Sequence, residues 1–568
     1  MTALDAKPRI LVIGGYGVFG GRLSRRLSAH HDLEIIVAGR RLSAAQAHCK
    51  EYGGTPAQID TNADIDAAIR KLQPAIVVDA AGPFQSYSGD PYRIARAAMR
   101  NGAHYLDLAD DADFVAGISN INDEAVTTEC VALSGCSSVP AISSAAVASL
   151  SHGLASIDLI ESAILPGNRA PRGRSVVEAI LAQVGKPIKV WRAGEPSTMR
   201  GWCDVTRASP KVANREPLGR RYASPIGAPD LQLFPSHYAT RTVRFKAGLE
   251  LSIMHLGLAA LAWLVRLGLM RSATPLSGWL LWVAEWLKPF GSDRGAMTVD
   301  VVGRTHDGVG ERRTYTIIAE AGDGPEIPST PAYVLARRLC REPERIPFGA
   351  RPCLDEMTIE DVEEGLKPFA INSGRTTEEM LTVFECALSD GYSELPEPIR
   401  DLHNVLDERA FVGSARVQRG NGVLSRLIGW CMGLPPAADD IEARVDMKRT
   451  VSGETWRRRF GNAVFCSHLS RRSGAPTGQI WERFGPLSFR INLHRDGDAL
   501  HYPVDAVRLL GFIALPAFLV PSSQTREYAD DSRAPCFDVR IDHPLAGFIV
   551  RYEGRLQPIE ALSSGEAV

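Results

Sequence analysis

The feature that most constrains the fold of this chain is a glycine-rich loop near its N-terminus. Residues 10–13 are an uninterrupted apolar run, as expected of a parallel strand buried on both faces. Gly15, Gly17 and Gly20 follow in the spacing G-x-G-x-x-G, and a helical pattern begins after them. The first glycine permits a tight turn, the second lets the backbone approach a pyrophosphate, and the third lets the helix pack closely on the strand. The pattern predicts a dinucleotide-binding loop at a helix N-terminus; the alternative is a glycine-rich turn without a ligand.

The second apolar run indicates which dinucleotide is bound. Residues 33–38 read as a strand that ends in Gly39, Arg40 and Arg41. In NAD-selective sites an acidic residue, about 20 positions after the glycines, binds the ribose 2′-hydroxyl. Arg40 stands there instead, and a guanidinium suits the 2′-phosphate of NADP through charge-assisted hydrogen bonds. NADP is therefore the expected cofactor; the alternative is a solvated basic turn.

Short apolar runs continue to alternate with helical patterns up to residue 134, which is the rhythm of βαβ units. We therefore expect an α/β fold, with a doubly wound parallel Rossmann sheet over residues 8–150. Ligands bind where loops leave the carboxyl edge of such a sheet. Asp60 lies just beyond the third strand and is expected to contact the adenine side of the cofactor. The alternative is that Asp60 caps a helix. The residues expected at the cofactor are Gly15, Gly17, Val18, Phe19, Gly20, Arg40, Arg41, Asp60, Ala81, Gly82 and Pro83.

Two polar residues near the same edge are the expected catalytic groups. Hydride transfer is the chemistry of the cofactor, so the protein has to align the substrate and manage one proton. Tyr87 follows the Gly82-Pro83 turn, which should face the nicotinamide, and is the expected proton donor. Asp107 ends the fifth strand and is expected to orient a substrate or ribose hydroxyl. The alternative for each is an ordinary surface group or a ribose contact. No metal-ligand cluster, G-x-S-x-G or P-loop lysine offers competing chemistry, and no metal is expected.

Five segments of this region carry a family resemblance, namely residues 14–20, 38–40, 79–84, 102–107 and 134–140. They resemble the saccharopine dehydrogenase/saccharopine reductase superfamily, in particular its bacterial saccharopine dehydrogenase-like, NADP-binding branch. The resemblance covers residues 8–150 and extends more loosely to residue 371. It implies a Rossmann domain, a mixed α/β substrate domain, and a returning segment, residues 330–371, that packs back on the Rossmann domain. It does not imply lysine chemistry, because the superfamily also contains lipid-modifying reductases and members without a known substrate.

Residues 151–329 are less regular and are expected to form a mixed α/β domain for substrate binding or dimerisation. Within it, residues 249–290 hold two apolar runs, and the second contains Trp279, Trp282 and Trp286. Neither run reaches the roughly 18 to 20 apolar residues needed to cross a bilayer. Tryptophans flanked by Lys and Arg fit a contact with a membrane surface. The alternatives are a subunit interface, as in a homodimer, a wall over the substrate site, or core packing.

Beyond a linker expected at residues 372–375, the apolar pattern changes to a period of two. Residues 376–568 contain about eight or nine such runs and one amphipathic helix at 423–432, and predict a separate antiparallel β-rich domain. Either a curved sheet surrounds the helix, or the strands form a barrel able to hold an apolar ligand. The region resembles an uncharacterised domain appended to some bacterial reductases of the same branch, which supplies no function.

Bulk properties narrow the function further. A net charge of −2 leaves no basic footprint for nucleic acid, so no nucleic-acid partner is expected. Ten scattered cysteines without a C-x-x-C pair fit reduced thiols in a cytoplasm, with a peripheral position at the inner face of the membrane if residues 249–290 touch lipid. The sequence therefore predicts an NADP-dependent oxidoreductase acting on a small-molecule, apolar or lipid-like substrate. The alternative is a cofactor-bound, non-catalytic protein that binds lipid or a partner.

Overall fold

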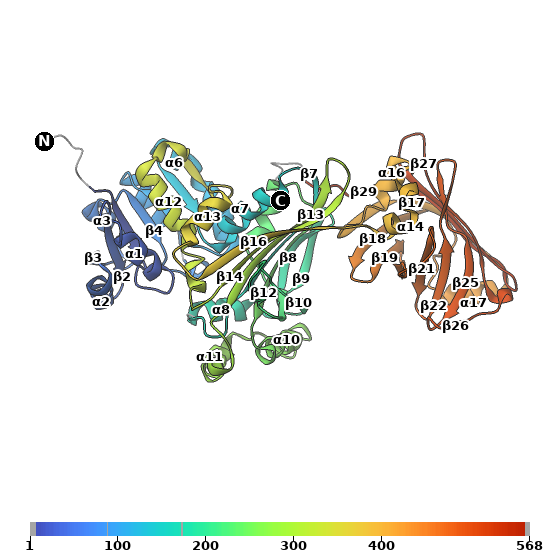
Figure 1. Ribbon diagram of the computed structural model, residues 1–568, viewed down its shortest axis with the longest axis horizontal. Coiled ribbons are helices and arrows are strands. Elements are labelled where there is room, and N and C mark those ends of the chain that lie inside the picture. Colours follow the sequence, from blue (N-terminus) through green and yellow to red (C-terminus); the bar gives the residue numbers. More distant parts are fainter. Residues whose placement is uncertain (1–6, 88, 172–173, 563–568) are drawn as a thin grey trace.

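Three sheets lie in a row along an elongated molecule (Figure 1). The computed structural model describes residues 7–87, 89–171 and 174–562. The N-terminal sheet is parallel, the middle sheet is mixed, and the C-terminal sheet is antiparallel. These three architectures confirm the predicted fold class of a Rossmann domain, a mixed α/β domain and a separate β-rich domain.

The N-terminal sheet has seven parallel strands in the order β15-β6-β5-β4-β1-β2-β3. Its strands are β1 (Arg9–Ile13), β2 (Glu34–Gly39), β3 (Thr55–Gln58), β4 (Ile76–Asp79), β5 (His104–Asp107), β6 (Val131–Ser134) and β15 (Gly349–Pro352). The helices between them are α1 (Gly20–Ser28), α2 (Leu42–Tyr52), α3 (Ile65–Leu72), α4 (Arg93–Arg100), α5 (Ala112–Gly117) and α6 (Asn122–Thr127). Central strands β1 and β4 are covered on both faces, which is why their sequences are continuous apolar runs.

The seventh strand, β15, comes from the returning segment and pairs with β6. Helices α12 (Thr330–Arg341) and α13 (Ile359–Leu366) flank it in the sequence. Thr358 and Asp361 form a capping box that starts α13. Arg26 of α1 binds the returning segment at two points, because its guanidinium donates to Thr330 Oγ1 (2.8 Å) and to the Gly365 carbonyl (2.6 Å). Residues 330–366 therefore contribute a strand and a covering layer to the Rossmann domain.

The middle sheet has the order β10-β11-β12-β7-β13-β14-β16, with a β8–β9 hairpin joined to β12. Its strands are β7 (Leu154–Leu165), β8 (Pro187–Arg192), β9 (Glu195–Arg200), β10 (Thr206–Ala208), β11 (Arg221–Pro225), β12 (Val243–Leu249), β13 (Gly295–Thr305), β14 (Gly310–Ala319) and β16 (Ile371–Glu379). The helices of this region are α7 (Ser143–Ser151), α8 (Arg174–Gln183), α9 (Asp230–His237), α10 (Ser252–Arg266) and α11 (Ser277–Trp286). Strand β13 is buried along most of its length between β7 and β14.

Strand β16 corrects the expected linker. All nine of its residues, 371–379, pair with β14, so residues 372–375 are not a linker and a boundary at 376 falls inside a strand. The strand is polar and at the edge of the sheet, so its sequence lacks the apolar alternation of a half-buried strand. The chain leaves the middle sheet only after Glu379.

The C-terminal sheet has thirteen strands and closes on itself. The segment from 499 to 509 contains β24 and β25, of which β24 pairs with β27 and β25 with β22. Tyr502 N donates to the Thr525 carbonyl (3.0 Å), and Asn492 N donates to the Pro503 carbonyl (3.0 Å). The segment is therefore hydrogen-bonded to β27 on one side and to β22 on the other, and it joins the two ends of the sheet. Of the two arrangements expected for this domain, the structure has the barrel.

The strands of this barrel are β17 (Glu408–Arg419), β18 (Ala438–Thr450), β19 (Gly453–Phe460), β20 (Ala463–Ser470), β21 (Gln479–Phe484), β22 (Leu487–Asn492), β23 (His494–Asp496), β24 (Ala499–His501), β25 (Val504–Leu509), β26 (Ile513–Ala514), β27 (Ser522–Ala529), β28 (Pro535–His543) and β29 (Gly547–Pro558). Its helices are α14 (Val383–Leu388), α15 (Asp390–Ser393), α16 (Glu397–Leu402) and α17 (Val423–Cys431). Leu402 of α16 and Ile428 of α17 help to line its interior, together with Met432 and Leu434, which follow α17.

Ion pairs join the barrel to the middle sheet. Arg244 of β12 contacts Asp407 (2.7 Å) and Glu408 (2.9 Å), and Arg192 of β8 contacts Glu408 (2.8 Å). These side chains are largely buried, so the pairs are screened little by solvent.

Among the described residues, no helix is long and apolar enough to cross a membrane.

Candidate functional site

The glycine loop has the geometry of a phosphate-binding turn. Gly14 has a φ of 75°, which a side chain would disfavour, and its carbonyl accepts a hydrogen bond from Gly17 N at 2.9 Å. A Cβ at Gly20 would lie 2.3 Å from the Gly14 carbonyl oxygen, so glycine is required where α1 meets the loop. A Cβ at Gly17 would have only that oxygen within 4 Å, at 3.1 Å. Space therefore remains beside Gly17 for a pyrophosphate to approach the backbone.

The neighbouring loop residues are held by local contacts, and their contacts with the cofactor stay predictions. Gly15 leaves no room for a side chain, because a Cβ there would lie 2.7 Å from the Val12 carbonyl oxygen. Phe19 immediately precedes α1, and the Val18 carbonyl accepts from Arg22 at 2.6 Å. The loop leads into the start of α1, where the helix dipole favours an anion.

Arg40 lies at the end of β2, exposed to solvent. Its carbonyl accepts from Gln58 Nε2 at 3.1 Å, but no described residue accepts a hydrogen bond from its guanidinium. The group is therefore free to bind a 2′-phosphate. Beside it, Arg41 N donates to the Tyr16 hydroxyl at 3.0 Å, and the Arg41 guanidinium is 5.8 Å from the Tyr16 ring centre.

Tyr16 is a residue of this site that the sequence analysis missed. Its ring lies over the backbone of Gly39, where an added Cβ would be only 2.6 Å away. The aromatic ring therefore joins the glycine loop to the end of β2 and restricts where the ribose can lie. A tyrosine between two glycines of the loop is the only sequence signal for this role.

Asp60 does not cap a helix. Its carboxylate accepts from Asn62 N at 3.0 Å within a turn, and α3 is capped by Asp64, which accepts from Ala67 N at 3.0 Å. Asp60 is exposed at the end of β3, and its contact with the adenine side stays a prediction.

The Ala81-Gly82-Pro83 loop abuts the glycine loop. A Cβ at Gly14 would lie 2.6 Å from the Ala80 carbonyl oxygen and 2.9 Å from Ala81 Cα. The two loops therefore form one continuous surface at the carboxyl edge of β1 and β4, where a nicotinamide is expected to lie.

The two expected catalytic residues lie close together at this edge. Asp79 and Asp107 are opposite each other in the register of β4 and β5, and both are fully buried. Burial raises the pKa of Asp79 to about 6 and that of Asp107 to about 7. The Tyr87 hydroxyl donates to Asp79 at 3.0 Å, and burial followed by the charge of Asp79 raises its pKa.

These contacts restrict what each group can do. Tyr87 is a neutral phenol whose proton is directed at Asp79, so another partner has to displace that bond before Tyr87 can donate. Asp107 accepts from Gly135 N (2.8 Å) and Ser134 Oγ (3.0 Å), and so also joins β5 to β6. A carboxyl with a pKa near 7 suits proton transfer. The catalytic roles of Tyr87 and Asp107 remain predictions.

A second acid–base cluster was missed from the sequence. His237 Nε2 lies 2.7 Å from Asp355 Oδ2, and the Tyr238 hydroxyl donates to Asp355 Oδ1 at 2.7 Å. His237 and Tyr238 are at the end of α9 in the middle domain, whereas Asp355 follows β15 of the Rossmann domain. The side chains of His237 and Asp355 are each 37% exposed. The cluster therefore places a partly accessible imidazole at the junction of the two domains.

The strand order, the glycine loop and the free guanidinium of Arg40 define an NADP-binding domain with a dehydrogenase fold. Residues 10–132 match the model described as the saccharopine dehydrogenase NADP binding domain. NADP is therefore its cofactor, and the space beside Gly17 fits that group. Residues 395–556 match a domain of unknown function, DUF4166. Both resemblances drawn from the sequence are confirmed.

Solved structures that are similar to part of the chain are distant in sequence. Saccharopine dehydrogenase (L-Glu forming) from Saccharomyces cerevisiae is 15% identical, with 65% of this chain and 100% of that chain covered and a TM-score of 0.48. Biliverdin reductase from Synechocystis, in complex with biliverdin and NADP+, is 8% identical over 64% of this chain and 96% of its own, with a TM-score of 0.29. A 3-ketoreductase from Actinomadura kijaniata, with NADP, is 10% identical over 64% and 94%, with a TM-score of 0.28. No curated protein sequence matches the chain.

Replacing Arg40 by aspartate is expected to weaken NADPH binding by about 10- to 100-fold, the loss of one or two charge-assisted hydrogen bonds. NADH, which lacks the 2′-phosphate, should bind nearly as before. Isothermal titration of both cofactors measures the difference. Lys50→Asp, an equal change of charge on exposed α2, is the control for long-range electrostatics and should alter neither affinity much. Equal loss of both cofactors in Arg40→Asp would contradict the assignment.

Proposed function

We propose that this protein is an NADP-dependent oxidoreductase that acts on an apolar, lipid-like substrate at a membrane surface. The observation that carries the proposal is an exposed apolar surface on α10 and α11, which we call the tryptophan surface. Trp279, Trp282 and Trp286 are 60%, 57% and 70% exposed. The other members are Ile253, Leu256, Trp263, Leu264, Leu267, Leu269 and Phe290.

The exposure of these side chains counts against the interpretation as core. Isolated apolar side chains on a surface are ordinary, but a group of them on two consecutive helices favours a contact site. In Figure 1 both helices lie below the middle sheet and project away from it. Helices of 15 and 10 residues are too short to span a bilayer and suit a position in the plane of its surface.

Basic groups border this surface. Arg266 stacks over Trp263 with its guanidinium 4.4 Å from the ring centre, and Lys288 follows the last tryptophan by two residues. Tryptophan together with Lys or Arg is the usual composition of a protein segment at a lipid headgroup layer. All ten cysteines are free, which supports a cytoplasmic position at the inner face of the membrane.

The proton required by hydride transfer has candidate sources on both sides of the domain junction. On the Rossmann side are Tyr87 and Asp107, and on the other side is His237, which contacts Asp355 across the junction. A histidine with a carboxylate on one ring nitrogen can exchange a proton through the other. His237→Gln and Tyr87→Phe, assayed for turnover and for NADPH binding, separate a role in proton transfer from one in cofactor binding.

The second candidate function is a cofactor-bound, non-catalytic protein that binds lipid or a partner. It is favoured by the fact that the Tyr87 hydroxyl and Asp107 Oδ1 already have partners within the protein. NADPH oxidation in the presence of extracted bacterial lipids distinguishes the two functions. Lipid-dependent consumption that is lost in Arg40→Asp supports the enzyme, whereas tight NADPH binding with no turnover on any fraction supports the alternative.

Removing the three tryptophans of α11 together should release most of the protein from lipid vesicles. Full burial of a large apolar side chain contributes about 1.5–3 kcal/mol, so three of them account for most of a weak surface affinity. Co-sedimentation with vesicles of phosphatidylglycerol and phosphatidylcholine measures the effect of the triple Trp→Ala variant. The triple Trp→Phe variant, which keeps large apolar groups, is the matched control and should remain largely bound.

The same variants test the alternative of a homodimer. If the tryptophan surface is a subunit contact, wild-type protein should not sediment with vesicles, and the alanine variant should shift to a smaller species in light scattering. Vesicle binding that is equal in the wild-type and alanine proteins would contradict the membrane proposal.

A further inference from the structure

The C-terminal barrel encloses a cavity of about 370 Å³. This volume falls at the lower end of the range of small-molecule sites, about 300–1,000 Å³. Strands from all round the barrel line it, including β18, β19, β22, β27 and β29. The closure of the sheet through residues 499–509 therefore creates an interior that is separate from the NADP site, which lies in the first of the three sheets (Figure 1).

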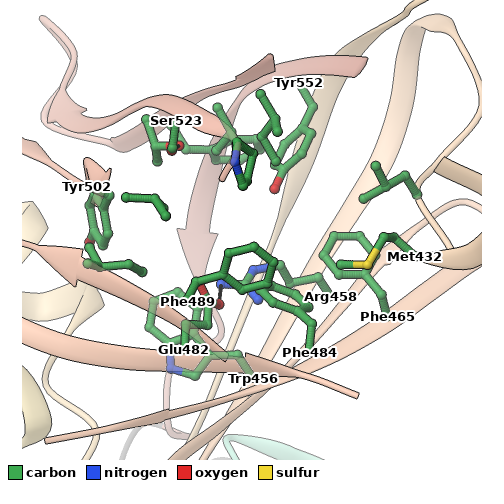
Figure 2. Close-up of a pocket in the computed structure, with 18 of the residues that line it drawn as sticks. Met432, Trp456, Arg458, Phe465, Glu482, Phe484, Phe489, Tyr502, Ser523 and Tyr552 are labelled. Atoms are coloured by element: carbon green, nitrogen blue, oxygen red, sulfur yellow. Dashed lines mark hydrogen bonds and ion pairs between the residues drawn. The ribbon is translucent and has the colours of Figure 1, made fainter. Parts of the chain in front are cut away.

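The wall of the cavity is largely aromatic and aliphatic. Figure 2 shows Phe465, Phe484, Phe489 and Trp456 on one side, with Tyr552 facing them from the other side. Phe460, Phe537, Ile491 and several leucines and valines also line it. A cavity with such a wall holds few waters and gains free energy when an apolar molecule fills it.

The arginine and the two glutamates that line the cavity already have partners within the protein. Arg458 is the only lysine or arginine among the described residues that line it, and its guanidinium donates to Glu482 (3.1 Å) and to Ser467 Oγ (2.7 Å). Both members of the Arg458–Glu482 pair are about 15% exposed, at 15% and 14%. Glu527 is held by His403 at 2.6 Å and by the Tyr502 hydroxyl.

This arrangement selects against anions. A carboxylate or phosphate inside the barrel would have to compete with Glu482 for Arg458 and would meet two acidic side chains in a poorly hydrated space. Burying a charge without a partner is costly, and like charges raise that cost. A hydroxyl or carbonyl on the ligand needs only one hydrogen bond, which the edge of the Arg458–Glu482 pair can supply.

We propose that the C-terminal domain binds one uncharged, apolar molecule bearing a hydroxyl or carbonyl group inside this barrel. The proposal goes beyond the oxidoreductase function and does not depend on it, because no residue of the cavity belongs to the NADP-binding domain.

Apolar segments border one end of the barrel. Helix α17 and residues 513–521 contribute Ile428, Met432, Leu515 and Leu519 to the cavity wall. The same segments and their neighbours expose apolar side chains, namely Val423, Trp430, Leu510, Phe512, Phe518 and Leu545. In Figure 1, α17 and β26 lie at the lower edge of the barrel, on the side of the molecule to which α10 and α11 also project. A ligand of low water solubility could therefore enter from a lipid phase without crossing a polar surface.

The probe is a pair of molecules that share one apolar chain and differ in charge: retinol, a neutral alcohol, and retinoic acid, its carboxylate. The full-length protein is titrated with each, without NADPH, and retinol fluorescence and co-elution in gel filtration report binding. Retinol should bind at one site per chain, and retinoic acid at least about tenfold more weakly, because a desolvated carboxylate faces Glu482 and Glu527.

Two variants show whether the site is the barrel. Ser523 of β27 lies at the cavity wall in Figure 2, and Ser523→Trp should fill the cavity and weaken retinol binding at least about tenfold. The next residue of the strand, Gln524, is exposed, because neighbours along a strand point to opposite faces. Gln524→Trp adds the same ring outside and should leave retinol binding unchanged.

A gain of binding guards against misfolding as an explanation. Glu482→Gln frees the Arg458 guanidinium, so retinoic acid should then bind at least about tenfold more tightly than it does to wild-type protein. The proposal is overturned if wild-type protein binds neither probe, if it binds retinoic acid as tightly as retinol, or if Ser523→Trp and Gln524→Trp behave alike. NADPH affinity is measured in parallel. If the wild-type protein did not bind NADPH, that result would count against the oxidoreductase function and leave the barrel proposal untouched.

Discussion

Replacing Gly17 by valine is expected to abolish measurable NADPH binding, a loss of at least about 100-fold, while the protein still folds. The reason is local. Gly17 has no positive φ, and a Cβ there has only the Gly14 carbonyl oxygen within 4 Å, at 3.1 Å, so the folded chain can accommodate a side chain. The branched side chain would instead fill the space in which the pyrophosphate approaches the backbone. Titration calorimetry measures the affinity, and thermal unfolding measures the fold.

Gly20→Val is the matched comparison. A Cβ at this position would lie 2.3 Å from the Gly14 carbonyl oxygen and 3.1 Å from the Ala80 side chain, so α1 has to shift. This variant should lose both cofactor binding and thermal stability. If Gly17→Val binds NADPH normally, the glycine loop is not the cofactor site.

Replacing Arg244 by methionine is expected to destabilise the protein by about 3–5 kcal/mol, the usual cost of removing one partner of a buried ion pair. Arg244 contacts Asp407 and Glu408, whose side chains are only 11% and 6% exposed. Without Arg244 the buried Asp407 carboxylate would lose this ion pair, whereas Glu408 would keep Arg192 and Lys448. Chemical denaturation measures the loss. Limited proteolysis should then cleave the chain between β16 and β17, where the middle domain meets the barrel.

The control for Arg244→Met is Arg416→Met, which removes an exposed pair with Asp439 and should cost no more than about 1 kcal/mol. The pH dependence provides a second check. Burial alone would raise the pKa of Glu408, but Arg192 and Arg244 hold it at about 2, below the ordinary 4.5. The ion pairs of Glu408 with Arg192 and Arg244 therefore stabilise the fold at neutral pH. This contribution is lost as the pH falls from about 4.5 towards 2 and Glu408 becomes protonated. An Arg244→Met protein as stable as wild type would contradict this account.

The parts of the fold that could be predicted from the sequence are those with a strong local pattern. Strands β1 and β4 are buried on both faces and read as apolar runs, whereas the barrel strands are half-buried and alternate. Strand β15 (Gly349–Pro352) was missed because it is a four-residue edge strand that contains an arginine and a proline. Periodicity also left the closure of the barrel undecided, because closure depends on which strands pair with residues 499–509.

The candidate site also has some residues that the sequence could predict and others that it could not. The glycines and Arg40 are close together in the sequence and have the spacing typical of dinucleotide-binding loops, so the sequence could predict them. His237 and Asp355 are separated by 118 positions, and neither has a neighbourhood that marks it. Their contact depends on how α9 of one domain meets the end of β15 of another. Tyr87 was located correctly at the carboxyl edge, but its hydrogen bond to Asp79 could not be inferred without the loop conformation.

Pairing of β6 with β15 has a consequence for how the protein is made. Residues 131–134 leave the ribosome long before residues 349–352, so the edge of the growing sheet has no partner while the whole middle domain up to β14 is translated. An unpaired strand edge of this kind is prone to associate with other chains. The cofactor domain is complete only once α13 has emerged. A nascent chain halted near residue 300 should therefore be a good client for chaperones and a poor binder of NADPH.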